Sequence, residues 1–282
     1  MQKSFKDQKP TLFVVSTPIG NLKDISYRAI EILNEVDFIL AEDTRTSSTL
    51  LNHYQIKKPL ISYHEFNKEE QSAKIISLLE NQKNLALISD AGTPGINDPG
   101  YEIIKEVIDK GFHVVSIPGA SAILAALVTS GLVIQPFTFI GFLPRKKSMI
   151  IEVLSDYKYR LETLVIYESP QRIDKSLKVL YEVLGNRRIS IARELTKTFE
   201  TIIRTDLEKA CLEEQNPKGE YVIIIEGNQQ KTSAQFGSIE EHYMHYLTLG
   251  YTQKDAMKQV AKDRNITKSE VYQIIKIENK SS

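Results

Sequence analysis

Four short apolar runs, rich in β-branched residues, constrain the fold most strongly, because each ends in a loop of polar or turn-forming residues. The runs occupy residues 12–16, 36–40, 85–89 and 113–117. Amphipathic patterns typical of helices lie between them, at residues 26–34, 68–80 and 101–110. This alternation favours a mostly parallel sheet with both faces covered. The loops after the strands are therefore expected to share the edge where α/β sheets bind ligands.

The loop after the third predicted strand, SDAGTPGINDPG at residues 89–100, is the richest in glycine and proline. It lacks the lysine and hydroxyl that follow the last glycine of a P-loop, and no predicted strand is followed by G-x-G-x-x-G. Its glycines allow a ligand close to the backbone, and its prolines stiffen the chain. Such a loop suits a flat or zwitterionic ligand better than a triphosphate.

The second half of the chain predicts strands with fewer helices between them. These strands fall at residues 137–142, 163–168, 187–194, 199–205 and 221–227, and the clearest helix covers residues 172–184. The pattern favours a mixed, partly antiparallel sheet. Residues 228–238 have the composition of a linker. We therefore expect an α/β protein with domains at residues 1–118 and 119–229, and a small helical module at 238–282.

The C-terminal module carries two helix starts of one design. Thr252 precedes Asp255 by three residues and Thr267 precedes Glu270 by three, the spacing of a capping box. Helices at 253–264 and 268–277 would resemble a helix-turn-helix. Two interpretations stay open: a capping or dimer-contact unit with solvated lysines, or a nucleic-acid contact through Lys254, Lys258, Lys262, Arg264 and Lys268.

Composition excludes several classes of protein. The chain of 282 residues has 36 basic and 36 acidic side chains, so binding to an anionic polymer would rest on local patches. A single cysteine, Cys211, excludes an intramolecular disulfide and a cysteine-built metal site. The longest apolar stretch, residues 120–133, is too short to span a bilayer, and residues 1–10 do not form a secretory signal. We therefore expect a cytoplasmic protein.

Motifs spread in order along the chain carry a family resemblance. They are STPIGN at residue 16, AEDTR at 41, SDAGTPGINDPG at 89, PGASA at 118, GFLPR at 141, ESPQR at 168, ARELTK at 192 and PKGEYV at 217. Together they resemble the tetrapyrrole methylase-like superfamily. More narrowly, they resemble its ribosomal RNA branch, which methylates the ribose 2′-oxygen of a cytidine in the 16S decoding centre.

The resemblance implies that S-adenosylmethionine binds, folded, in a cleft between the two α/β domains. It implies that the loop at residue 90 and neighbouring loops of the first domain contact the cofactor. In the second domain, strands and loops that face the cleft would contact it. The implied cofactor-binding residues are Pro18, Asp90, Ala91, Gly92, Ile96, Ser121, Ala122, Phe142, Leu143, Ala192 and Gly219. Taken singly, the glycines and prolines of these loops could also be ordinary turn residues.

Methyl transfer from a sulfonium to a hydroxyl needs alignment and removal of a proton, and it requires no metal. From the matched motifs, the candidate catalytic residues are Glu42, Asp43, Asp90, Glu194 and Lys197. The candidate RNA-binding residues are Arg45, Arg145, Lys146, Arg172, Arg193, Lys258 and Lys262. An alternative for Glu42, Asp43 and Arg45 is an ion-pair network at a dimer contact. The family also implies a homodimer, and 16S ribosomal RNA within the 30S subunit as partner.

Two other functions stay open. One is a methyltransferase of the same fold that acts on a small molecule such as a tetrapyrrole. The other is a non-enzymatic module that binds RNA or ribosomal subunits through its C-terminal helices. The segment SYHEFN departs from the family pattern at Phe66, where members usually carry a second histidine. We therefore interpret His64 as a loop residue held by a hydrogen bond.

Overall fold

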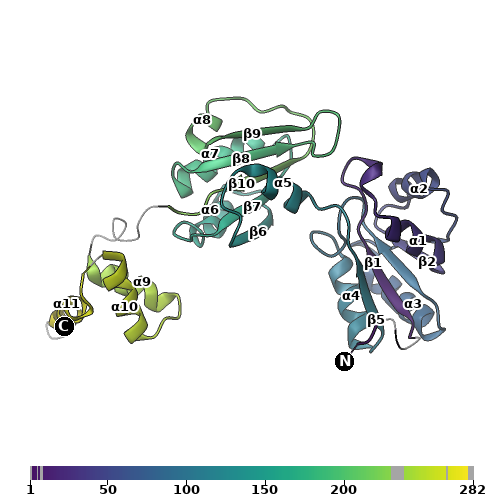
Figure 1. Cartoon of the computed structure of the whole chain (residues 1–282), viewed down its shortest axis with the longest axis horizontal. Helices are drawn as coiled ribbons and strands as arrows, with labels where there is room; N and C mark the ends of the chain where they lie inside the picture. The colour runs from purple at the N-terminus through teal and green to yellow at the C-terminus, as the bar shows by residue number, and fades with distance from the viewer. Residues whose placement is uncertain (1, 5, 7–8, 230–237, 265, 279–282) are drawn as a thin grey trace.

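The computed structural model describes residues 2–4, 6, 9–229, 238–264 and 266–278. Two α/β domains lie side by side, and a unit of three helices projects from the second domain on the side away from the first (Figure 1). Most of the predicted linker, residues 230–237, lies outside the described residues. In the described part of the chain, no helix is long and apolar enough to cross a membrane.

The first domain contains a five-stranded parallel sheet, β3-β2-β4-β1-β5. Its strands are β1 (Thr11–Val15), β2 (Phe38–Ala41), β3 (Leu60–Ser62), β4 (Leu85–Ile88) and β5 (His113–Ile117). The connections contain the short 3-10 helix η1 (Leu22–Asp24) and helices α1 (Tyr27–Glu35), α2 (Thr44–His53), α3 (Lys68–Glu80) and α4 (Gly100–Asp109). Buried apolar residues form a core on each face of the sheet. The predicted parallel sheet is confirmed.

Three elements of this domain were not predicted: the short η1, strand β3 and helix α2. Strand β3 has three residues, too few to show a period. Helix α2 is largely polar, and its only buried residues are Ser47 and Leu51. The additional strand corrects one expectation: the loop beginning at Ser89 follows the fourth strand along the chain, not the third.

The second domain contains a five-stranded mixed sheet, β6-β7-β10-β8-β9, in which only the β6–β7 pair is parallel. Its strands are β6 (Phe137–Phe142), β7 (Thr163–Glu168), β8 (Arg188–Arg193), β9 (Thr201–Asp206) and β10 (Tyr221–Ile225). Its helices are α5 (Ala122–Ser130), α6 (Lys147–Ser155), α7 (Ile173–Leu184) and α8 (Leu207–Ala210). This confirms the mixed sheet and the predicted helix, here α7, whereas α5, α6 and α8 were not predicted.

Helix α5 covers one face of the second sheet. Ala126 and Leu127 pack there against Val165, Val222 and Ile224. Helices α6, α7 and α8 pack on the other face, in the largest apolar core that the described residues form. The division of the chain at residues 118 and 119 stays our proposal.

Within its described residues, 238–264 and 266–278, the C-terminal unit has three helices instead of the predicted pair: α9 (Ile239–Thr248), α10 (Gln253–Arg264) and α11 (Lys268–Glu278). Their common core includes Tyr243, Val260 and Val271. At the start of α11, Thr267 N donates to Glu270 Oε2 (2.6 Å) and Glu270 N donates to Thr267 Oγ1 (3.3 Å). These reciprocal bonds form the predicted capping box.

Candidate functional site

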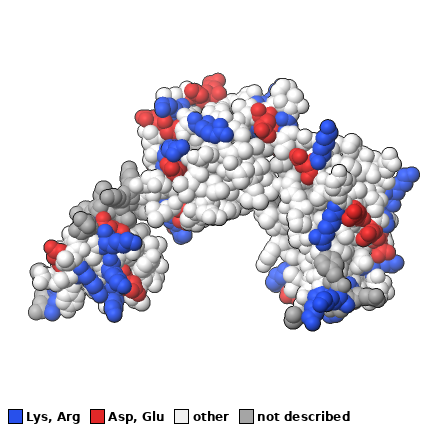
Figure 2. Space-filling model, in the orientation of Figure 1, with Lys and Arg blue, Asp and Glu red and all other residues white. Residues whose placement is uncertain are grey.

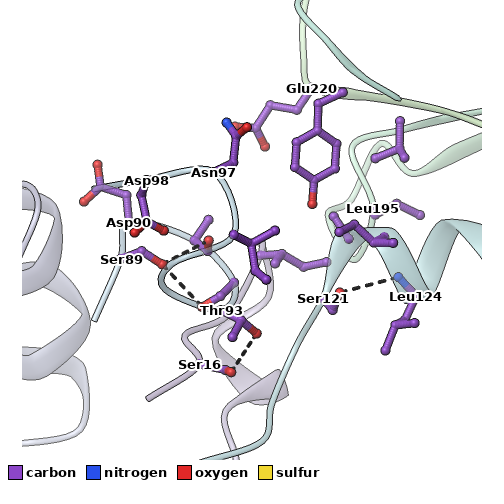
Figure 3. Close-up of a pocket in the computed structure, with 18 of the residues that line it drawn as sticks. Ser16, Ser89, Asp90, Thr93, Asn97, Asp98, Ser121, Leu124, Leu195 and Glu220 are labelled. Carbon is purple, nitrogen blue, oxygen red and sulfur yellow. Dashed lines mark hydrogen bonds between the residues drawn. The ribbon is translucent and has the colours of Figure 1, made fainter. Parts of the chain in front are cut away.

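The loops that follow β1 and β4 are hydrogen-bonded to each other. Thr17 N donates to Gly92 O (2.8 Å), and Gly92 N donates to Thr17 O (3.1 Å). A further bond joins the Ser16 and Thr93 hydroxyls at 2.8 Å, as Figure 3 shows. Gly92 has a φ of +79°, a conformation that side chains other than glycine rarely adopt. The two loops therefore form one fixed surface at the carboxyl edge of the parallel sheet. We call this surface, built around Ser16, Thr17, Gly92 and Thr93, the ledge.

Asp98 organises the remainder of the β4–α4 loop. Its Oδ1 accepts hydrogen bonds from the backbone N–H groups of Gly95 and Gly100, both at 2.8 Å. A Cβ added at Gly100 would lie 2.8 Å from the same Oδ1. The turn thus requires glycine at that position, where α4 begins.

A cavity of about 820 Å³ lies between this ledge and the second domain. Figure 3 shows Ser89, Asp90 and Thr93 on the first-domain side, with Leu195 and Glu220 across from them. Ile19, next to the ledge, packs into an apolar cluster with second-domain residues. The site is therefore shared by both domains.

Most predicted cofactor residues lie on this cavity. Those that line it are Asp90, Ala91, Gly92, Ile96, Ser121, Ala122 and Phe142. Four others are not among the lining residues: Pro18 is buried beside the ledge, and Leu143 and Ala192 belong to apolar cores. The fourth, Gly219, lies against Glu194. The contacts of all these residues with a cofactor stay predictions.

The cavity has further lining residues that sequence reasoning did not single out. They include Asn97, Asp98, Ser116, Tyr167, Glu220 and Tyr221. All except Ser116 and Tyr167 fall within the quoted motifs. The motifs could therefore have pointed to these four residues as cavity residues. Which side chain of a motif faces the cavity depends on the packing of the two domains.

Carboxylates gather at the first-domain end of the cavity, where Glu42, Asp90 and Asp98 are lining residues. Burial raises the pKa of Glu42, and the negative charge of Asp90 raises it further. Burial also raises the pKa of Asp90, although the Asp43 N–H donates to its Oδ1 at 3.3 Å. This end of the cavity therefore favours a cationic group of a ligand.

Asp43 is bound by Arg45 instead of facing the cavity. Arg45 Nη2 lies 2.6 Å from Asp43 Oδ2, and the Arg45 N–H donates to Asp43 Oδ1 at 2.8 Å. These bonds lower the pKa of Asp43 to about 2. Asp43 also caps the start of α2, and the Arg45 side chain is 90% exposed. The two residues lie at the rim of the cavity. The catalytic role of Asp43 and the RNA-binding role of Arg45 stay predictions.

Glu194 and Lys197 belong to a second ionic cluster, which we call the Lys197 clasp: Glu194, Lys197 and Glu220. Lys197 Nζ lies 2.9 Å from both Glu194 Oε1 and Glu220 Oε2, and Glu220 N donates to Glu194 Oε1 at 3.0 Å. The bond from Lys197 lowers the pKa of Glu194. Burial alone would lower the pKa of Lys197, but its two carboxylate partners raise it.

The clasp touches the first domain at Gly20. A Cβ at Gly20 would lie 2.5 Å from Lys197 Cγ and 3.1 Å from the Leu195 carbonyl oxygen. Glu194 itself has a φ of 52°, in the left-handed region. The backbone after β8 is thus bent so that the clasp reaches across to the loop that follows β1.

His64 lies in the loop that leads to α3. Its backbone N–H donates to Asn67 Oδ1 at 2.8 Å. The predicted hydrogen bond therefore comes from the main chain, and the buried ring atom Nδ1 has no hydrogen-bond partner among the described residues. Phe66 is 96% exposed and packs edge-on near the His64 ring.

The predicted RNA-binding cations differ in their surroundings. Arg145 and Lys146 are exposed just before α6. Arg172 Nη2 donates to the carbonyl groups of Leu143 and Pro144, at 2.7 and 2.9 Å, and Arg193 Nε donates to Lys218 O at 2.8 Å. The latter two arginines thus hold loops of the second domain. Lys258 and Lys262 are exposed on α10, in the C-terminal unit.

Comparison with known proteins identifies the family. The model of Tetrapyrrole (Corrin/Porphyrin) Methylases matches residues 11–211. The chain is 46% identical to a ribosomal RNA small subunit methyltransferase I of Halalkalibacterium halodurans, covering 95% of this chain and 96% of the relative. It is 44% identical to the protein of that name from Bacillus subtilis, covering 96% of each. A crystal structure of diphthine synthase shares the fold, with a TM-score of 0.61 at 16% identity, covering 77% of this chain and 90% of that one.

The chain therefore belongs to the tetrapyrrole methylase family, a class of methyltransferases. The resemblance to the ribosomal RNA branch is confirmed by relatives that span nearly the whole chain.

The close approach at Gly20 predicts a coupling between the domains. Gly20→Ala should lower the free energy of unfolding by roughly 1–3 kcal/mol, because the new Cβ overpacks against Lys197. In a Lys197→Ala background the penalty should be smaller, and a double-mutant cycle by chemical denaturation measures the difference. An equal penalty in both backgrounds would contradict the contact.

The lowered pKa of Glu194 predicts a pH-dependent stability. Its contribution should be complete above the ordinary value of 4.5 and be lost as the pH falls through the lower folded-state value. The destabilisation caused by Glu194→Gln should therefore shrink below pH 4.5 in denaturation experiments. Glu31→Gln, at an exposed position on α1, is the control. A Glu194→Gln difference that is constant with pH would refute the assignment.

Proposed function

We propose that this protein transfers a methyl group from S-adenosylmethionine to the ribose 2′-oxygen of a cytidine in the decoding centre of 16S ribosomal RNA. The proposal draws on the relatives that bear the name ribosomal RNA small subunit methyltransferase I. The observation that carries it is the cavity shared by the two domains, with Glu42, Asp90 and Asp98 on its first-domain side.

The residues of the cavity fit S-adenosylmethionine, which carries a positive sulfonium and a positive ammonium group. Glu42, Asp90 and Asp98 supply negative charge at the first-domain end. The backbone of residues 90–96 would hold the methionine part, and Phe142 and Tyr167 provide aromatic surface on the second domain. When bound, the cofactor supplies an electrophilic methyl group on its positive sulfur, and the thioether that leaves is neutral.

Glu42 is the proposed acceptor of the ribose hydroxyl proton. Burial and the neighbouring Asp90 charge raise its pKa, which makes its carboxylate a better base than an exposed one. Asp90 is assigned to the cofactor's positive charge. Asp43 is assigned a positioning role, because its ion pair holds Arg45 at the rim of the cavity. Glu194 and Lys197 are also positioning residues, because their ion pair holds the second-domain wall of the cavity in place.

Exposed cations around the rim are the proposed phosphate contacts. Arg45, Arg145 and Lys146 have the exposure that such contacts need. Arg172 and Arg193 are assigned a supporting role, since their guanidinium groups hold backbone carbonyls of second-domain loops.

We further propose a cytoplasmic homodimer that acts on RNA within the 30S subunit. Exposed apolar side chains support a second copy as a partner. Val128 of α5 is 70% exposed, Phe199 is also 70% exposed, and Val133 is 59% exposed. Burying them in a dimer would remove apolar surface from water.

The deciding experiment incubates the protein with labelled S-adenosylmethionine and unmethylated 30S subunits. The label should appear at one cytidine, as a ribose modification that resists alkaline cleavage. Label on a tetrapyrrole and not on RNA would favour the small-molecule alternative. Absence of cofactor binding in calorimetry would favour the non-enzymatic alternative.

Two single substitutions should separate chemistry from binding. Glu42→Gln should reduce turnover by about 10²–10⁴-fold, because proton removal is lost. The Kd for S-adenosylmethionine should rise far less than in Asp90→Asn, because Asp90 and Asp98 still supply negative charge. Asp90→Asn should weaken cofactor binding by about tenfold, because a charged partner is lost.

Calorimetry and single-turnover methylation measure these two effects. Glu80→Gln, at an exposed position on α3, should leave both values unaltered. Normal turnover by Glu42→Gln would rule out Glu42 as the proton acceptor.

A further inference from the structure

A second hollow lies in the C-terminal unit, apart from the cavity described above. It is an open groove of about 490 Å³ between the first turns of α10 and α11. Its lining residues are Gln253, Lys254, Met257, Lys268, Ser269 and Tyr272. We call it the α10–α11 groove.

The groove combines cationic side chains with helix starts. Lys254 and Lys268 are exposed and come from the first turns of the two helices. The positive ends of both helix dipoles therefore lie at the same opening. Figure 2 shows several Lys and Arg side chains on the visible face of this unit, with some Asp and Glu side chains among them. These features favour an anionic ligand.

Two carboxylates near the groove are engaged in capping. Asp255 Oδ2 accepts from Thr252 Oγ1 at 2.6 Å, and Glu270 Oε2 accepts from Thr267 N at 2.6 Å. Each is held at the start of its own helix, and neither is a lining residue. They reduce the positive charge of the unit without occupying the groove.

The groove also offers a surface for a flat ring. Tyr272 is 48% exposed, and Lys276 Nζ lies 5.5 Å from its ring centroid. Met257 adds a half-buried apolar side chain beside it. An aromatic platform with flanking cations is the combination by which proteins bind single-stranded nucleic acid. An acidic peptide would need only the cations.

We propose that the α10–α11 groove binds one nucleotide of single-stranded RNA, with the base stacked on Tyr272 and the flanking phosphates held by Lys254 and Lys268. The inference rests on the proposed function, because it gives the RNA substrate a second contact away from the methyl-transfer cavity. The proposal assigns the RNA contact to Lys254 and Lys268. Lys258 and Lys262, which were predicted from the sequence as RNA-binding residues, do not line the groove.

The test measures binding of a fluorescein-labelled oligouridine to the full-length chain by anisotropy over a range of salt concentrations. Lys254→Ala/Lys268→Ala should flatten the slope of log K against log salt by about 1.4, since each phosphate contact on a single strand contributes about 0.7. Tyr272→Ala should weaken binding by about tenfold. Tyr272→Phe should retain the wild-type affinity, because the ring remains.

Matched variants decide between the groove and a general charge effect. Lys74→Ala/Lys178→Ala, at exposed positions on α3 and α7, removes the same charge and should leave binding unchanged. An equal loss from Lys258→Ala/Lys262→Ala, or no loss from Tyr272→Ala, would overturn the groove assignment. An acidic peptide that competes while oligouridine does not bind would also overturn it.

The same preparations separate this inference from the proposed function. Every variant is assayed for S-adenosylmethionine binding by calorimetry and for methylation of 30S subunits. If the wild type binds oligouridine through the groove but never methylates 30S subunits, the proposed function fails and the groove stands. If methylation is normal and groove variants bind oligouridine as the wild type does, only the groove assignment fails.

Discussion

The backbone pairing of Thr17 with Gly92 is the interaction on which the site depends. It joins the loops after β1 and β4, neighbouring strands of a parallel sheet, with two hydrogen bonds of 2.8 and 3.1 Å. A residue with a side chain at position 92 would be strained there, because φ is +79°. Once the two loops are joined, Asp90 and the turn around Asp98 can only lie at the edge of the cavity.

The second domain completes the cavity through ionic contacts and packing. Lys197 holds Glu194 and Glu220 together and lies against Gly20, so its position links the wall of the cavity to the loop after β1. The buried Ile19 adds an apolar contact between the same two parts. The carboxylates of Glu42 and Asp90 thereby stay in a partly desolvated space, where their pKa values rise and a cation is favoured.

Much of this arrangement could be predicted from local patterns. The apolar runs of β1, β2, β4 and β5 are dense enough to mark buried parallel strands, and the motifs mark the loops at their ends. Strand β3 and helix α2 were missed because one is too short and the other too polar for a period to show.

Which motif residues line the cavity, and which charged residues pair, depends on long-range packing that local patterns do not show. The GFLPR motif led to both Phe142 and Leu143, yet only Phe142 lines the cavity, because successive residues near a strand end point to opposite sides. Likewise, Lys197 looks like a candidate base in the sequence. Its two carboxylate partners raise its pKa in the folded chain, and only the tertiary structure brings Glu220 to it.

The most direct measurement is a crystal structure of the protein with S-adenosylhomocysteine. The account predicts the ligand in the cavity between the domains, with its methionine part against the backbone of residues 90–96 and its amino group near Asp90. A ligand bound elsewhere, or in this cavity with its adenosine part at Asp90, would contradict it.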